Sequence, residues 1–225
     1  MSNEELINNL VLDGYLKTPR IIQALRKIDR ADFMPEKYKN SAYVNEPLPI
    51  GENQTISQPL TVAFMLELLE PKAGEKILDI GAGSGWQSAL LAYIVSQPPI
   101  SESSQHLSAS SPHESAGCVV AVERILKLKA LAEKNISKYG FTSRGIVKVI
   151  WKNAAGGVPE EAPFDKIIAA ASAEAIPEAW KSQLKVGGRL VAPVKNSFVV
   201  LDKVSETEFK EKEYYGFSFV PLVVD

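Results

Sequence analysis

The chain has 225 residues, of which 45% are hydrophobic, and a formal net charge of −2, so it can bury one sizeable α/β core. A charge this close to zero gives no electrostatic reason to expect nucleic acid or an anionic membrane as a partner. No apolar run approaches about 20 residues, and the single cysteine, Cys118, excludes an internal disulfide framework. We therefore expect one cytoplasmic domain, residues 1–225, without a metal site.

Residues 1–59 are predicted to form two short helices, an irregular segment and a polar loop. Ser2 and Glu5 have the spacing of a capping box, and Thr18–Pro19 gives a second helix start. Prolines interrupt residues 29–49, which predicts irregular structure there. The positions expected to be buried in the two helices are Leu6, Ile7, Leu10, Val11, Ile21, Ile22, Leu25 and Ile28.

A glycine-rich turn follows the short apolar strand predicted at 77–80. Glycines at 81, 83 and 85 permit positive φ, and the helix predicted to begin at Trp86 offers unpaired N–H groups to a ligand. In the dinucleotide fingerprint G-x-G-x-x-G the third glycine would fall on Trp86, so a nicotinamide cofactor is disfavoured. The pattern that begins at Asp79, Asp-x-Gly-x-Gly-x-Gly, resembles the first motif of class I S-adenosylmethionine-dependent methyltransferases. A glycine turn in another kind of α/β domain remains the alternative.

Residues 97–117 are rich in serine and proline and are predicted to be a flexible insertion. Both histidines of the chain, His106 and His113, lie in this insertion without further metal ligands around them. Without the insertion, Glu123 lies about 20 positions after the glycine turn, where an acid binds ribose hydroxyls in nucleotide-binding folds. We therefore assign Glu123 to the ribose of the cofactor. The alternative is a surface acid that starts the helix predicted at 124–138.

Strands and helices alternate along the rest of the chain. Strands are predicted at 118–122, at 146–151, after residue 162 and after Gly187–Gly188, and a closing pair at 198–204 and 214–220. This order predicts a Rossmann-like class I methyltransferase fold: a doubly wound, mostly parallel sheet with a C-terminal antiparallel strand pair and an N-terminal helical extension. Ligands of such sheets bind at the carboxyl ends of the strands. The residues expected at that edge are Gly81, Glu123 and Asn153.

The polar loop makes the resemblance more specific. Its sequence, Leu48-Pro49-Ile50-Gly51 followed by Gln54-Thr55-Ile56-Ser57-Gln58-Pro59, is similar to the loop that precedes the glycine motif in protein-L-isoaspartate O-methyltransferases. Residues 162–177 and 217–222 also resemble that family, so the likeness covers nearly the whole chain except the insertion. It implies methyl transfer from S-adenosyl-L-methionine to the carboxylate of isoaspartyl residues in damaged proteins, which begins their repair.

The resemblance also implies a set of site residues. Ser57 and Thr55 are expected to be catalytic. The cofactor is expected to contact Gln54, Thr55, Ile56, Ser57, Asp79, Gly81, Gly83, Gly85, Glu123, Asn153 and Ala154. Judged by position alone, Ser57 lies where a helix begins, so its hydroxyl could hold an anion or simply cap the helix.

Several residues depart from the pattern of the family. Asn153–Ala154 stands where the family usually has Asp-Gly, and an alanine that had to adopt positive φ would cost about 1–2 kcal/mol. Glu52–Asn53 and Leu60 also differ from the common residues. A non-catalytic S-adenosylmethionine-binding homologue would explain these departures, and a class I methyltransferase with another substrate would not need residues 54–59. Base-handling motifs of nucleic-acid methyltransferases are absent from the sequence. The expected partners are isoaspartyl-containing proteins, bound by a monomer.

Overall fold

The computed structural model describes residues 1–98 and 117–216. Most of the predicted insertion at 97–117, both histidines and the family-like ending at 217–222 lie outside the described residues. The elements in chain order are α1 (Asn3–Leu12), α2 (Pro19–Lys27), η1 (Arg30–Phe33), η2 (Glu36–Ser41), β1 (Leu48–Gly51), β2 (Gln54–Ile56), α3 (Pro59–Leu69), β3 (Lys76–Ile80), α4 (Trp86–Ser96), β4 (Cys118–Glu123), α5 (Leu126–Ser137), β5 (Val147–Trp151), η3 (Pro159–Glu161), β6 (Phe164–Ala169), α6 (Glu178–Gln183), β7 (Leu184–Val194), β8 (Ser197–Lys203) and β9 (Phe209–Tyr215).

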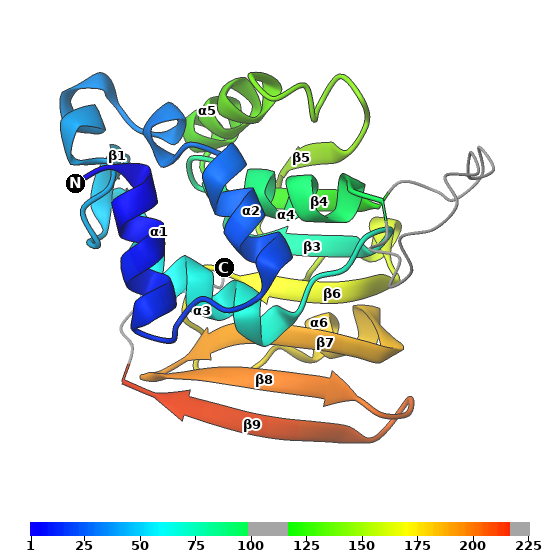
Figure 1. The fold of residues 1–225 in the computed structure, drawn as a ribbon. Helices are drawn as coiled ribbons and strands as arrows, with labels where there is room; N and C mark the ends of the chain where they lie inside the picture. The colour runs from blue at the N-terminus through cyan, green and yellow to red at the C-terminus, as the bar shows by residue number, and fades with distance from the viewer. Residues whose placement is uncertain (99–116, 217–225) are drawn as a thin grey trace, which may run out of the picture.

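The centre of the fold is a seven-stranded sheet in the order β5-β4-β3-β6-β7-β8-β9 (Figure 1). Strands β5, β4, β3, β6 and β7 are parallel, whereas β8 and β9 are antiparallel to their neighbours. The chain enters the sheet at β3, proceeds outward through β4 and β5, and then returns to the other side of β3 to form β6. The point where the strand order reverses, between β3 and β6, is where doubly wound sheets bind ligands. The predicted fold class is confirmed.

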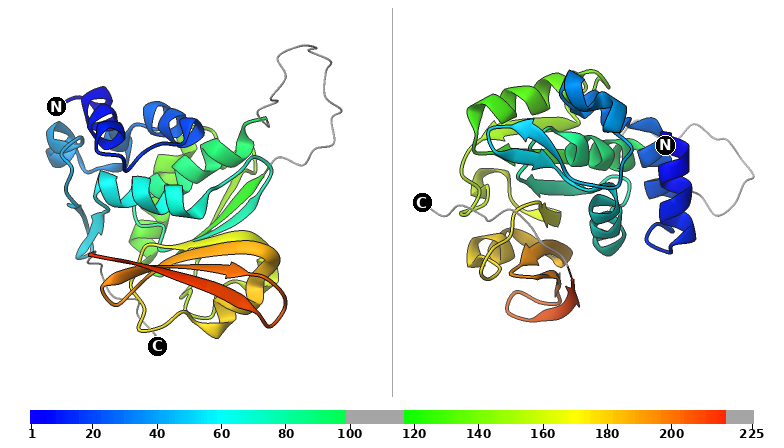
Figure 2. Two further views of the ribbon diagram at one scale, coloured as in Figure 1. Left: turned by 60° about the horizontal axis from the view of Figure 1, so that its bottom comes forward. Right: turned by 90° about the vertical axis from the view of Figure 1, so that its left-hand side faces the viewer.

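The central parallel strands β3, β4 and β6 are largely apolar and buried, because both of their faces are covered. Ile77 and Val119 belong to the core under α2, α3, α4 and α5, whereas the alternate residues Leu78 and Val120 pack with Trp180 of α6. The right-hand view of Figure 2 shows α1 and α3 on one side of the sheet and α6 on the other. In the part of the chain that the structure describes, we find no helix with the length and apolarity to cross a membrane.

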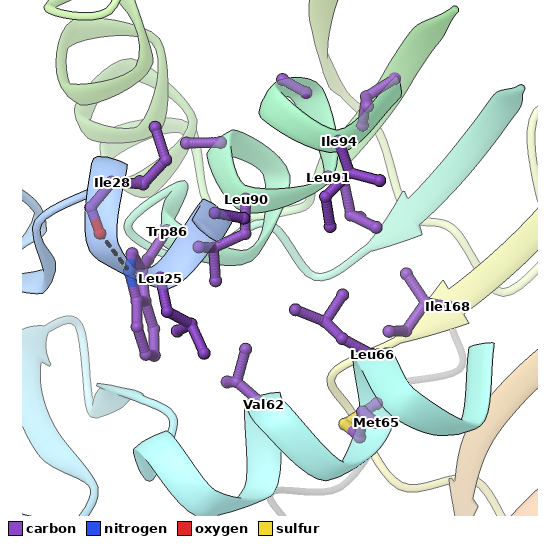
Figure 3. Close-up of a cluster of buried hydrophobic side chains, with 14 of the residues drawn as sticks. Leu25, Ile28, Val62, Met65, Leu66, Trp86, Leu90, Leu91, Ile94 and Ile168 are labelled. Atoms are coloured by element: carbon purple, nitrogen blue, oxygen red, sulfur yellow. Dashed lines mark hydrogen bonds between the residues drawn. The ribbon is translucent and has the colours of Figure 1, made fainter. Parts of the chain in front are cut away.

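The N-terminal helices pack directly on the helix that follows the glycine motif. Leu25 of α2, Val62 of α3 and Leu90 of α4 meet in one buried cluster (Figure 3). Trp86, the first residue of α4, is 3% exposed, and its indole N–H points at the carbonyl oxygen of Ile28, 3.5 Å away. The segment that precedes the polar loop is therefore fixed against the start of α4.

Three local predictions were wrong. Val11, expected to be buried, is 40% exposed, because the apolar face of α1 is limited to Leu6, Ile7 and Leu10. The polar loop contains a short antiparallel hairpin, β1–β2. The closing strand expected at 214–220 begins at Phe209 instead, because the Val204 N–H bonds the Glu208 carbonyl and turns the chain back immediately after β8.

Candidate active site

A cavity of about 340 Å³ lies at the switch point of the sheet, within the range of roughly 300–1,000 Å³ that is usual for small-molecule sites. Its walls come from the carboxyl ends of β3, β4, β5 and β6 and from the β1–β2 hairpin. The predicted site residues among its lining are Gln54, Thr55, Ile56, Ser57, Gly81, Gly83, Glu123, Asn153 and Ala154. Two predicted site residues, Asp79 and Gly85, are not part of the lining.

The glycine turn forms the floor of this cavity. Gly81 and Gly83 both have positive φ, +86° and +56°. The N–H groups of Gly81 and Ala82 donate to the carbonyl oxygen of Val122 in β4, at 2.9 and 3.0 Å, which fixes the turn to the neighbouring strand. Gly85 also has positive φ, but a Cβ there would lie 2.9 Å from Ile136 of α5. Gly85 therefore allows two helices to pack closely and does not face a ligand.

Glu123 connects the glycine turn to the end of β4. Its side chain is buried, and each carboxylate oxygen accepts one backbone N–H at 2.9 Å, from Gly83 and from Ile125. A carboxylate has about four acceptor positions, so two remain for hydroxyl donors in the cavity that Glu123 lines. The arrangement can both hold the turn and bind vicinal hydroxyls.

Asp79 lies behind the cavity and is not part of its lining. It is fully buried, and its two oxygens accept from the Gln87 side-chain amide at 2.8 Å and the Ser88 hydroxyl at 2.5 Å. Burial raises the pKa of Asp79 to about 6, an effect that the negative charge of Glu123 strengthens and the two hydrogen bonds oppose. Its partner Gln87 does line the cavity, so Asp79 positions the start of α4.

The β1–β2 hairpin forms the opposite wall. Gln54, Thr55 and Ile56 of β2 and the next residue, Ser57, all face the cavity. Ser57 does not cap α3, because the cap residue is Gln58. The Leu60 N–H donates instead to the Asn45 side-chain oxygen, at 2.9 Å. Within residues 1–98 and 117–216, the Ser57 hydroxyl makes no hydrogen bond. It is therefore available to a ligand, and Asn45 performs the capping role that position alone suggested for Ser57.

Arg30 holds the Ser57 segment in place and was missed by sequence reasoning. Its guanidinium is 1% exposed and donates to four carbonyl oxygens, those of Ala42 at 2.6 Å, Val44 at 3.2 Å, Glu46 at 2.9 Å and Ser57 at 3.1 Å. Burial lowers the pKa of Arg30 to about 10. An arginine in a segment expected to be irregular gives no signal of burial, since arginines are usually exposed.

The Asn153–Ala154 departure does not strain the backbone. The described non-glycine residues with positive φ are Glu52, Asn53, Glu70 and Lys195. Ala154 is not one of them, so the penalty considered for it does not arise. The Asn153 side-chain oxygen accepts from the Ala155 N–H at 3.0 Å, and the Ala154 carbonyl oxygen accepts from the Trp180 indole at 2.8 Å. Both residues are thus fixed at the β5 end of the cavity.

The sheet order, the glycine turn at the switch point and the acid at the end of β4 are those of a class I S-adenosylmethionine-dependent methyltransferase. Sequence comparison then specifies the family. A model of the protein-L-isoaspartate(D-aspartate) O-methyltransferase family matches residues 1–225, and the chain belongs to this family. The predicted resemblance is confirmed.

Individual relatives agree with this assignment. A protein-L-isoaspartate O-methyltransferase of Methanopyrus kandleri is 37% identical over 99% of this chain and 91% of its own length. One of Staphylothermus marinus is 39% identical over 93% of this chain and 88% of its own. A solved Plasmodium falciparum structure, described as a protein-L-isoaspartate O-methyltransferase in complex with S-adenosyl-L-homocysteine, superimposes with a TM-score of 0.83 over 99% of both chains. At 22% identity, that match shows a shared fold.

Proposed function

We propose that this protein transfers a methyl group from S-adenosyl-L-methionine to the carboxylate of isoaspartyl residues in damaged proteins. The observation that supports this most strongly is a single cavity with two different walls. One wall is the glycine turn with Glu123, and the other is the Gln54–Ser57 segment that carries a free hydroxyl. Membership of the family and the names of the relatives support the same reaction.

The residues of the first wall fit the cofactor. Gly81 and Gly83 bring backbone close to the cavity, Glu123 has acceptor positions left for ribose hydroxyls, and Asn153 and Ala154 form the end where the adenine would bind. When bound, S-adenosyl-L-methionine supplies a sulfonium methyl group that a nucleophilic oxygen can displace. Thr55, which lies in the opposite wall beside Ser57, is proposed to help orient the acceptor.

The acceptor needs no general base. A carboxylate is ionised at neutral pH, so its oxygen can attack without first losing a proton. The Ser57 hydroxyl would donate to one carboxylate oxygen and leave the other to attack. The chain then contributes position and water exclusion, which are large effects when reacting atoms are held about 3 Å apart.

The test is transfer of labelled methyl to a peptide with one isoaspartyl residue, beside its aspartyl twin. Label on the isoaspartyl peptide alone, reduced at least tenfold in Ser57→Ala, is the expected result. Ser182→Ala on the exposed side of α6 is the matched control and should match the unmodified protein. Binding of S-adenosylhomocysteine without transfer to either peptide would replace this proposal with that of a non-catalytic homologue.

Finer statements on assembly, location and partners also belong to the proposal. The protein is proposed to act as a monomer, in the cytoplasm, on protein substrates and without nucleic acid or membrane. Light scattering checks the first of these. A dimer at micromolar concentration would contradict it.

A further inference from the structure

Within the described part of the chain, the guanidinium of Arg30 is a buried charge without an acid to neutralise it. All its partners are backbone carbonyl oxygens, and no aspartate or glutamate of the described residues forms an ion pair with it. Burial is also the cause of its lowered pKa. Fully buried arginines are uncommon unless an acid pairs with them, because the charge loses its hydration.

The position of this charge relates it to the cavity. One guanidinium nitrogen lies 3.1 Å from the carbonyl oxygen of Ser57, a residue that lines the cavity. The guanidinium carbon lies 5.4 Å from the ring centroid of Trp86, which also lines the cavity and closes the buried cluster of Figure 3. The positive charge therefore lies directly behind the wall that Ser57 and Trp86 form.

Several of the other sources of positive potential at this end are already engaged. Helix α3 begins with Pro59, which has no N–H, and the N–H groups of Leu60 and Val62 are bonded to Asn45 and Gln58. Lys152 pairs with Glu160 at 3.0 Å. Arg124 belongs to the wall at the end of β4, next to Glu123. Arg30 thus supplies a full positive charge directly behind the Ser57 wall.

We propose that Arg30 is the buried cation that makes the Ser57 end of the cavity selective for an anionic acceptor. This inference rests on the proposed function and adds a specificity-determining residue to it. A charge in a low-dielectric wall acts more strongly on a nearby ion than it would in water. It attracts a carboxylate and has little effect on a carboxamide of the same shape.

The chemistry of the transfer gives the effect a particular kinetic form. The acceptor carboxylate loses its negative charge as the carbon–oxygen bond forms and the carbon–sulfur bond breaks. The field of Arg30 therefore stabilises the bound carboxylate more than it stabilises the transition state. An interaction of this kind lowers KM without raising kcat. If Arg30 only held Ser57 in place, its removal would displace Ser57 and lower kcat instead.

The test compares two peptides within each protein variant, with S-adenosylhomocysteine bound. One peptide carries the isoaspartyl residue and the other carries a carboxamide in place of its methyl-accepting carboxylate. The unmodified protein should bind the carboxylate at least tenfold more tightly. In Arg30→Met this ratio should fall below threefold, whereas Arg30→Lys should retain it. Arg26→Met removes a neighbouring, exposed arginine of α2 and should leave the ratio unchanged.

Both peptides bind to the same variant, so the ratio removes losses that they share, and Arg30→Lys, which keeps the charge but not the four hydrogen bonds of the guanidinium, separates the charge from displacement of the loop. In turnover, Arg30→Met should raise KM for the isoaspartyl peptide about tenfold and leave kcat within threefold. An unchanged ratio in Arg30→Met, or no preference in the unmodified protein, would overturn the inference. Circular dichroism checks the fold, and Arg30→Gln, which is also neutral, replaces Arg30→Met if that variant is unfolded. Absence of methyl transfer by the unmodified protein would contradict the proposed function and not the role of Arg30.

Discussion

The two walls of the cavity are built in different ways. The glycine-turn wall belongs to the central sheet, and its contacts, such as those of Glu123 with Gly83, are made between adjacent strands and their turns. The hairpin wall is a two-stranded sheet of its own, and Arg30 and Asn45 hold the segment that follows it. Isolated hairpins are marginally stable in water. One wall is therefore rigid with the core, whereas the other depends on a few anchoring side chains.

The largest expected effect compares a glycine of the glycine turn with a glycine of the hairpin. Gly85→Ala requires positive φ from alanine, about 1–2 kcal/mol, and also places a Cβ 2.9 Å from Ile136, which adds overpacking of about 1–3 kcal/mol. We expect a loss of about 3 kcal/mol in the free energy of unfolding. Gly51→Ala in the hairpin is the control: its φ is +100°, but nothing lies within 4 Å of the new Cβ. Urea titration measures the unfolding free energy of both variants. Equal losses in the two variants would contradict the difference in packing between the glycine turn and the hairpin.

The next effect concerns the buried carboxyl group behind the glycine turn. The pKa of Asp79 is about 6 in the folded protein and about 3.9 when unfolded, so the folded state holds its proton to higher pH. Its contribution to stability is therefore greatest below pH 4 and falls as pH rises towards 6, by about 3 kcal/mol in total. The side-chain amide of an Asp79→Asn variant does not titrate, so that variant lacks this dependence on pH.

The measurement is the difference in unfolding free energy between Asp79→Asn and the unmodified protein at pH 4 and at pH 7. Taking a difference cancels the titration of the other groups, and it should shift in favour of the variant by about 2 kcal/mol over that interval, since part of the total effect lies below pH 4. The variant can keep its contacts, because Gln87 Oε1 has no partner in the described part of the chain and can accept from the new amide. If the unfolding free energies of the two proteins changed by the same amount between pH 4 and pH 7, the raised pKa of Asp79 would be refuted.

A smaller effect is expected for cofactor binding. Glu123→Gln keeps one acceptor oxygen but turns an NH₂ group towards the backbone N–H of Gly83 or Ile125, where a donor faces a donor. We expect the affinity for S-adenosylhomocysteine, measured by calorimetry, to fall about 10- to 100-fold, equivalent to about 1.4–2.7 kcal/mol. Glu133→Gln on the exposed face of α5 is the control. An unchanged affinity in Glu123→Gln would remove this residue from the cofactor site.

The contrast between the walls also explains what the sequence could predict. The strand order and the glycine turn follow from local patterns, since fully apolar strands and glycine spacing are visible in the chain. Asp79 could not be placed behind the cavity from sequence, because its contacts with Gln87 and Ser88 depend on how α4 leaves the turn. The hairpin and Arg30 were missed for a related reason: distant segments fix them, and short polar strands carry no distinct pattern. The role of Ser57 stays a prediction.

The smallest effect is expected at the tip of the hairpin. Gly51 pairs with Gln54, so Glu52 and Asn53 form a two-residue turn in which both have positive φ, +51° and +56°. Turns of this kind favour Asn-Gly, because glycine adopts positive φ without a steric cost. Asn53→Gly should therefore stabilise the protein. The gain should be only about 0.5 kcal/mol, because asparagine already tolerates positive φ and because glycine also makes the unfolded chain more flexible, which opposes the gain. A paired urea titration can resolve that gain. A loss of stability would mean that the Asn53 side chain, and not only its backbone, supports the hairpin wall.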